Sequence, residues 1–198
     1  FSMNDRVRSF LKIQDGCDYP CTYCTIPKAR GKSRSDSQLN ILKNIKILER
    51  NKISEIVITG VNIGDYGRAK LDGSLLDLLL NIEKKTKISR FRISSIEPNL
   101  LTNDIINFIN DSSRFLPHFH IPLQSGNDKI LKLMKRKYNT KMYRDKIDLI
   151  RSAIPDACIG ADIIVGFPDE SADDFLKTFN YIESLDINYL HVFSYSNR

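Results

Sequence analysis

The sequence lacks tryptophan, long apolar runs, internal repeats and low-complexity segments. No stretch approaches the roughly 18 consecutive apolar residues of a membrane span, and the first residues do not show the basic-then-apolar pattern of a signal peptide. Cysteine is also scarce: four residues are too few for the disulfide framework of a small secreted protein. These absences predict a globular, one-domain protein of the reducing cytoplasm with no membrane partner. We also expect it to be a monomer.

The charge balance does not decide whether the protein binds nucleic acid. The chain has 30 basic and 24 acidic residues, and a net charge of +6. This excess is compatible with a nucleic-acid partner, and equally with a basic surface that only contacts water. The basic residues gather in two short stretches, at Lys28, Arg30, Lys32 and Arg34, and at Lys132, Lys135, Arg136 and Lys137.

Apolar, β-branched runs alternate along the chain with amphipathic stretches. The runs predict strands near residues 8–14, 55–60, 90–95, 117–123, 158–167 and 187–195. The stretches predict helices near residues 36–50, 74–84, 103–110, 127–135, 141–152 and 172–184, with Thr102 and Ser171 as N-caps. This alternation is typical of an α/β fold with parallel strands. Six such units predict an open, partial (β/α)6 TIM-like barrel, and a doubly wound sheet is the alternative.

In both architectures ligands bind beyond the carboxyl ends of the strands. The segments that follow the predicted strands are polar or rich in glycine: "QDGCDYPC", "GVNIGDYG", "SSIEPN", "LQSGND", "GFPDES" and "SYSNR". We therefore expect these segments to meet at one rim and form one site. On the strands themselves, His118 and His120 are interpreted as packing residues, and Asp162 as an inward carboxylate that needs a partner.

Three cysteines, Cys17, Cys21 and Cys24, follow the first predicted strand with the spacing C-x3-C-x2-C. A disulfide would leave one thiol unpaired, and a redox pair of Cys21 and Cys24 would leave Cys17 without a role. A structural zinc site needs a fourth ligand, and the nearest histidines lie about a hundred residues further on. Three soft thiolates suit an iron–sulfur cluster that keeps one iron open to a small molecule.

This cysteine pattern, with Tyr23 just before the third cysteine, resembles the radical S-adenosylmethionine superfamily. The motifs "FLKIQDGCDYPCTYCTIPKARGKSRS", "GVNIGDYG", "SSIEP", "HIPLQSGNDKILKLMKRKY" and "DIIVGFPDES" are similar to the radical core of its methylthiotransferases. The resemblance implies that Cys17, Cys21 and Cys24 hold a 4Fe–4S cluster. S-adenosylmethionine would bind the open iron, and an electron donor would trigger its cleavage to a 5′-deoxyadenosyl radical.

The form "TGVNIGDYG" is most similar to the branch that adds a methylthio group to threonylcarbamoyladenosine beside the anticodon of tRNA. The sister branches act on isopentenyladenosine in tRNA and on an aspartate of a ribosomal protein, and both remain alternatives. Full-length members also carry an N-terminal domain with a second 4Fe–4S cluster and a C-terminal TRAM domain. We therefore expect residues 1–198 to be a radical core that lacks both domains and is incomplete for full activity. A zinc-loaded RNA-binding module without chemistry is the alternative from another class.

The resemblance also implies a set of S-adenosylmethionine contacts. Tyr23 is expected beside the adenine, Arg136 near a carboxylate, and the Gly166–Phe167 segment against a flat ring. For each residue, local packing or turn formation is the competing interpretation. The complete predicted set is Tyr23, Asn62, Ser95, Glu97, Gln124, Ser125, Arg136, Gly166 and Phe167.

Overall fold

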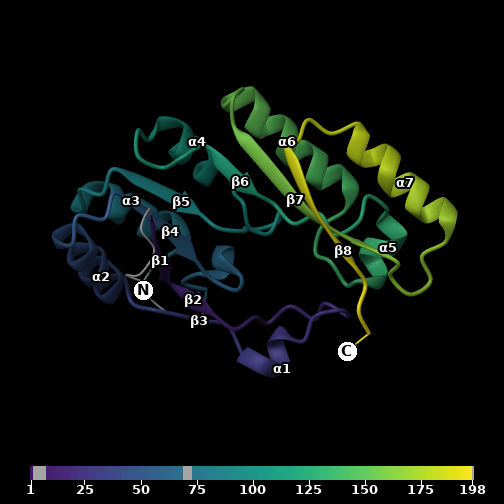
Figure 1. The fold of residues 1–198 in the computed structure, drawn as a ribbon, viewed down its shortest axis with the longest axis horizontal. Helices are drawn as coiled ribbons and strands as arrows, with labels where there is room; N and C mark the ends of the chain where they lie inside the picture. The colour runs from purple at the N-terminus through teal and green to yellow at the C-terminus, as the bar shows by residue number, and fades with distance from the viewer. Residues whose placement is uncertain (2–7, 69–72, 198) are drawn as a thin grey trace.

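A computed structural model describes residues 1, 8–68 and 73–197. Within them, helices and parallel strands alternate along the chain (Figure 1). One parallel sheet consists of β1 (Ser9–Lys12), β4 (Glu55–Thr59) and β5 (Arg90–Ile93). A second consists of β6 (His118–His120), β7 (Cys158–Val165) and β8 (Tyr189–Ser194).

The two sheets continue into each other between β5 and β6. The Leu116 N–H donates to the Phe91 carbonyl at 2.9 Å, and the Ile96 N–H donates to the His120 carbonyl at 3.0 Å. The spatial order of the six strands therefore follows their order in the chain, without the reversal that defines a doubly wound sheet. The described strands form an arc with β1 at one edge and β8 at the other, which confirms the predicted open, partial barrel.

Helices line the outer side of this arc (Figure 1). They are α2 (Gln38–Arg50), α3 (Leu75–Lys85), α4 (Asn103–Asp111), α6 (Thr140–Ala153) and α7 (Ala172–Glu183). Their N-caps are serine, threonine or asparagine side chains that accept a backbone N–H, including the predicted Thr102 and Ser171. The first four bury apolar stripes against the sheets, so the main core lies between strands and outer helices. The last, α7, contributes only the partly buried Tyr181 and Ile182 to this core, and its fully buried residues are Asp174 and Thr178. None of these described helices is long and apolar enough to cross a bilayer.

Side chains on each strand alternate between this core and the inner face of the arc. On β7, Ile159, Ala161 and Ile163 belong to the core. Asp162 and Ile164 therefore face inward, and the strand register places them opposite His191 and Phe193 of β8. The inner face near β7 and β8 is thus polar and aromatic, whereas the outer face is aliphatic.

A chain of hydrogen bonds crosses this inner face. Tyr189 Oη lies 3.1 Å from His118 Nε2 and 3.1 Å from His120 Nδ1. His120 Nε2 lies 2.9 Å from Asp162 Oδ1, which is also 3.3 Å from Nδ1 of His191. The prediction that Asp162 points inward and needs a partner is confirmed, and the two strand histidines pack as expected rather than standing free.

Gly160 provides a test of this inner face. A Cβ atom at Gly160 would lie 2.0 Å from the Tyr189 ring, so Gly160→Ala must displace the tyrosine and its hydrogen bonds. We expect the free energy of unfolding to fall by about 1–3 kcal/mol in urea denaturation. In a Tyr189→Ala background the same substitution should cost far less. Equal costs in the two backgrounds would contradict this assignment.

Candidate metal and cofactor site

The cysteine loop is closed at its base by a short antiparallel ladder. There β2 (Gln14–Asp15) pairs with β3 (Arg34–Ser35), and the Cys17 N–H donates to the Gly31 carbonyl at 3.1 Å. Gly16 has a φ of 72°, and a Cβ there would lie 2.1 Å from the Lys32 carbonyl oxygen. Only glycine fits this crossing point, so the sequence "GCDYPC" begins with a residue that the loop geometry requires.

A buried amide connects the loop base to the end of β4. Gln14 Nε2 donates to the Gly16 carbonyl at 2.7 Å and to Ser33 Oγ at 3.0 Å. Its Oε1 accepts the Asn62 N–H at 2.8 Å. The loop is therefore fixed to a second strand end as well as to its own flanks.

The three loop cysteines are free, partly buried thiols that line one cavity of about 380 Å³. Burial raises the pKa of Cys17 and Cys21, although Arg136 opposes the rise at Cys21. The Tyr19 N–H points at Cys17 Sγ at 3.4 Å, and such donors stabilise sulfur that carries negative charge. Among the residues that the structure describes, no histidine and no further cysteine lines this cavity.

The thiols are not arranged for a single metal ion. The described residues contain one group of three side chains close enough to hold one ion, and it is His120, Asp162 and His191 rather than the cysteines. A tetrahedral zinc with bonds of about 2.3 Å would hold its sulfur ligands roughly 3.8 Å apart. A three-thiol site that is too open for one ion suits a multi-iron cluster, and this geometry disfavours the zinc alternative.

Arg136 joins the cysteine loop to the barrel. Its side chain is only 3% exposed and forms an ion pair with Glu97, beyond the end of β5. One guanidinium nitrogen donates to Tyr23 Oη at 3.0 Å and to Cys21 Sγ at 3.2 Å, and Nε donates to Tyr138 Oη at 3.0 Å. Although burial opposes the charge, these partners raise the pKa of Arg136 above its ordinary value, so it stays protonated.

The loop also docks on the short helix α5 (Asp128–Leu133), which follows β6. The Thr22 hydroxyl donates to the Leu133 carbonyl at 3.0 Å, and the Thr22 N–H donates to the Met134 carbonyl at 3.3 Å. Between the docked loop and the ends of β7 and β8 lies an open pocket of about 270 Å³. The pocket is lined by Tyr23, Thr25, Gln124, Asp162, Ile164, Phe193, Ser194, Tyr195 and Ser196.

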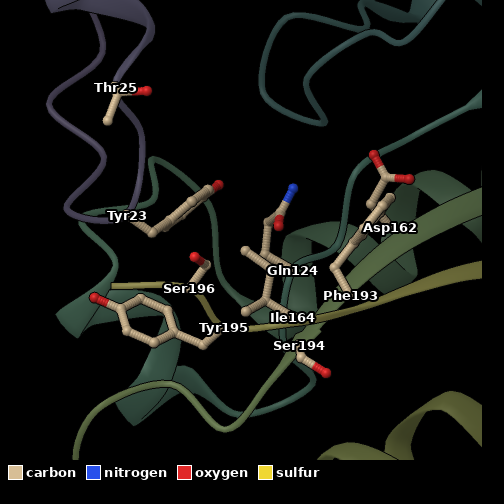
Figure 2. A pocket seen from close by; sticks show the side chains of 9 residues that line it. All are labelled: Tyr23, Thr25, Gln124, Asp162, Ile164, Phe193, Ser194, Tyr195 and Ser196. Carbon is tan, nitrogen blue, oxygen red and sulfur yellow. The ribbon is translucent and has the colours of Figure 1, made fainter. Parts of the chain in front are cut away.

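Figure 2 shows Tyr23 on one side of this pocket, and Ile164 and Phe193 on the other. Of the predicted contacts, Tyr23 and Gln124 line it. Sequence reasoning missed Phe193 and Tyr195, although their alternate positions at the end of the last strand are a usable signal.

Asn62 lies at the cysteine cavity. It is 4% exposed, and its Nδ2 approaches Cys17 Sγ to 4.0 Å. Its side-chain oxygen is buried and accepts no hydrogen bond. A buried acceptor without a partner is costly, so this atom fits a donor group of a bound molecule, such as the ammonium of an amino acid.

The other predicted contacts divide into two groups. Gly166 has a φ of 75° and borders open space, and Phe167 packs edge-on against Tyr195 with ring centroids 5.4 Å apart. Ser95 is exposed just past β5. Ser125, in contrast, is fully buried, and its hydroxyl bonds to Thr178 and to the Asn127 N–H. Its hydroxyl is engaged within the protein, and the contact of Ser125 with S-adenosylmethionine stays a prediction.

With this geometry in place, the comparisons with known proteins decide the family. The sequence model of the radical SAM superfamily matches residues 11–182. The chain belongs to the radical SAM superfamily. Solved radical SAM enzymes share its fold at low identity. The methyltransferase TsrM from Kitasatospora setae has a TM-score of 0.77 at 13% identity, over 93% of this chain and 35% of that one.

Coproporphyrinogen III oxidase from Escherichia coli has a TM-score of 0.68 at 17% identity, over 96% of this radical SAM chain and 44% of that one. Closer relatives come from sequence. The threonylcarbamoyladenosine tRNA methylthiotransferase MtaB of Bacillus subtilis is 38% identical over all of this chain and 44% of its own length. Its counterpart in Thermotoga maritima is 41% identical over 100% of this chain and 45% of its own length.

A tRNA-2-methylthio-N(6)-dimethylallyladenosine synthase from Syntrophobacter fumaroxidans is 40% identical over 95% of this chain and 41% of its own length. The resemblance to methylthiotransferases is therefore confirmed. The chain spans less than half the length of these curated relatives.

The cofactors of this superfamily are a 4Fe–4S cluster and S-adenosylmethionine, and the residues present fit them. Cys17, Cys21 and Cys24 would hold the cluster, and the unpartnered oxygen of Asn62 offers an acceptor beside it. When bound, the cluster supplies the electron that cleaves S-adenosylmethionine. The chain itself orients the thiols and holds a fixed positive charge at Cys21 through Arg136, and Tyr23 lines the neighbouring pocket.

Substitution of Arg136 tests whether its buried ion pair keeps the cysteine loop in position. Arg136→Met leaves the Glu97 carboxylate largely buried without its counterion, and we expect a loss of about 3–5 kcal/mol in the free energy of unfolding, with less iron bound per chain. Adding Glu97→Gln should restore part of the stability. The exposed Lys132→Met is the matched control. Wild-type stability and iron content in Arg136→Met would overturn the assignment.

The environment of His118 predicts that the stability of the protein depends on pH. Burial, together with the charges of Arg92 and His120, lowers the pKa of His118 to about 4. In the unfolded chain the same imidazole has a pKa near 6.5, so as the pH falls the unfolded state binds the proton before the folded state does. The free energy of unfolding therefore falls as the pH drops from about 6.5 to 4. Because His118 is only half-buried, we expect its share to be about 1 kcal/mol. Urea midpoints at pH 7 and 4.5 should differ less in His118→Gln; an unchanged difference would contradict the prediction.

Proposed function

We propose that this chain is the radical core of a tRNA methylthiotransferase that modifies threonylcarbamoyladenosine next to the anticodon. The supporting observation is the convergence of Cys17, Cys21 and Cys24 on one cavity beside a pocket, within a chain that is 38–41% identical over at least 97% of its length to four proteins bearing that name. The reaction replaces the hydrogen on C2 of the adenine with a methylthio group. Its partners are S-adenosylmethionine, tRNA and an electron donor, and the protein acts as a monomer in the cytoplasm.

The charges around the cysteine cavity support an RNA partner. Lys28 and Lys32 are exposed on its lining and are positioned to meet phosphates. Arg34, in contrast, is engaged with Asp15 at 2.8 Å, and Lys12 pairs with the same carboxylate at 2.9 Å. In the basic stretch after the cysteines, Arg34 thus helps to close the loop, whereas the side chains of Lys28 and Lys32 are available to bind a polyanion.

The second candidate substrate is dimethylallyladenosine in tRNA. Relatives that carry the dimethylallyladenosine synthase name reach 36–40% identity, close to the values for the first candidate. The two substrates differ in the group on N6 of the adenine, so the modified nucleosides distinguish them directly.

Deletion of the gene tests the proposal in cells. We expect mass spectrometry of total tRNA nucleosides to show loss of the methylthio form of threonylcarbamoyladenosine and accumulation of its precursor. Methylthio-dimethylallyladenosine should be unchanged. The opposite pattern would assign the chain to the second substrate, and no change in either nucleoside would overturn the proposal.

Substitution of one cysteine tests the chemistry. Anaerobically reconstituted protein should release 5′-deoxyadenosine from S-adenosylmethionine when dithionite is added, and Cys21→Ala should abolish this release. Cys158→Ala is the matched control, because Cys158 is a free cysteine on β7 outside the cavity. Persistent cleavage in Cys21→Ala, or zinc in place of iron, would sink the proposal.

A further inference from the structure

Three inner-face residues have no role in holding the cluster: Asp162, His191 and Phe193. Asp162 and His191 are direct cross-strand neighbours on β7 and β8, and Phe193 follows on the same face. Phe193 is 52% exposed and, with Asp162, lines the open pocket (Figure 2). Phe193 thus presents an aromatic surface to the pocket on the same face as a carboxylate and an imidazole.

Asp162 and His191 each keep one hydrogen-bonding atom that a ligand could use. His120 and His191 both bond to the same oxygen of Asp162, at 2.9 Å and 3.3 Å. Within the described structure, the second oxygen of Asp162 and Nε2 of His191 make no hydrogen bond. The pair therefore offers one carboxylate oxygen and one ring nitrogen, with the imidazole orientation already fixed by Asp162.

The aromatic neighbour indicates the shape of the ligand. The Phe193 ring lies 6.5 Å from the His191 ring, centroid to centroid, at an angle of 74°. Proteins bind unpaired bases by stacking them on aromatic rings and reading their edges with hydrogen bonds. A planar base on Phe193 would bring its substituents toward the Asp162–His191 pair.

We propose that Phe193 stacks on the target adenine and that the Asp162–His191 pair selects a polar group on its N6. This inference rests on the proposed function and names its specificity residues. A threonylcarbamoyl group carries N–H, hydroxyl and carboxylate groups that satisfy both members of the pair. A dimethylallyl group satisfies neither and would leave them desolvated without partners, which is the strongest basis for rejecting an analogue.

A single metal ion is the competing occupant, since His120, Asp162 and His191 offer ligand atoms within 4.8 Å of one another. The observations favour a base. The imidazoles already satisfy one oxygen of Asp162, and a metal would break both of those bonds. A metal also gives no account of the exposed Phe193.

The test uses the full-length gene product and two anticodon stem-loop RNAs, one with threonylcarbamoyladenosine and one with dimethylallyladenosine. The readout is the ratio of kcat/KM for methylthiolation of the two. We expect His191→Phe to lower this ratio roughly 10- to 100-fold, the effect of losing a hydrogen bond to a charged group. Val192→Ala is the matched control, because Val192 is on the same strand and faces the opposite side.

Phe193→Ala should raise KM for both RNAs alike, and Phe193→Tyr should restore it. An unchanged selectivity ratio in His191→Phe would overturn the inference. So would a rise in KM for S-adenosylmethionine in Phe193→Ala, or a divalent metal bound one per chain and lost in His191→Phe. Failure of the proposed function is distinct, because the unsubstituted protein would then leave the threonylcarbamoyl RNA unmodified.

Discussion

The buried contact between Arg136 and Glu97 holds the site together. The cysteine loop is a long excursion, and β2 and β3 fix only its base. Its far side is positioned by the Arg136 guanidinium, which reaches Glu97, Tyr23 and Cys21 together, and by the two hydrogen bonds of Thr22 to the end of α5. Because a buried charge is tolerated only when paired, the loop and the end of β5 must adopt one relative position. The placement of the thiols is therefore a consequence of charge satisfaction as much as of loop sequence.

The barrel has two chemically different faces. Outside, aliphatic side chains pack against the helices in ordinary close contact. Inside, a hydrogen-bonded row from His118 to His191 replaces the branched aliphatic layers of a closed barrel. Such a row is stable only because each member has a partner, and it leaves the rim free to meet a polar ligand. The same strands therefore form both the hydrogen-bonded inner wall and the rim at which a ligand can bind.

Much of this architecture could be predicted from the sequence, because periodicity and capping act locally. The strand runs, the approximate helix positions, and the caps Thr102 and Ser171 match the structure, whereas Leu39 of α2 and several apolar residues of α7 are exposed. The cysteine spacing was sufficient to indicate the cluster. What sequence could not give depends on contacts distant in the chain. The hydroxyl of Ser125 bonds to Thr178 of α7, which lies 53 residues further along the chain. Phe193 resembles an ordinary strand residue until the register of β7 and β8 places it on the inner face, opposite Ile164.

The outermost strands of the arc have fewer backbone neighbours than the strands between them. In a closed barrel every strand is hydrogen-bonded on both sides. Within the described residues, β1 is paired with β4 alone and β8 with β7 alone. The cysteine loop and Phe193 are therefore attached to the two strands that depend most on side-chain packing for their position.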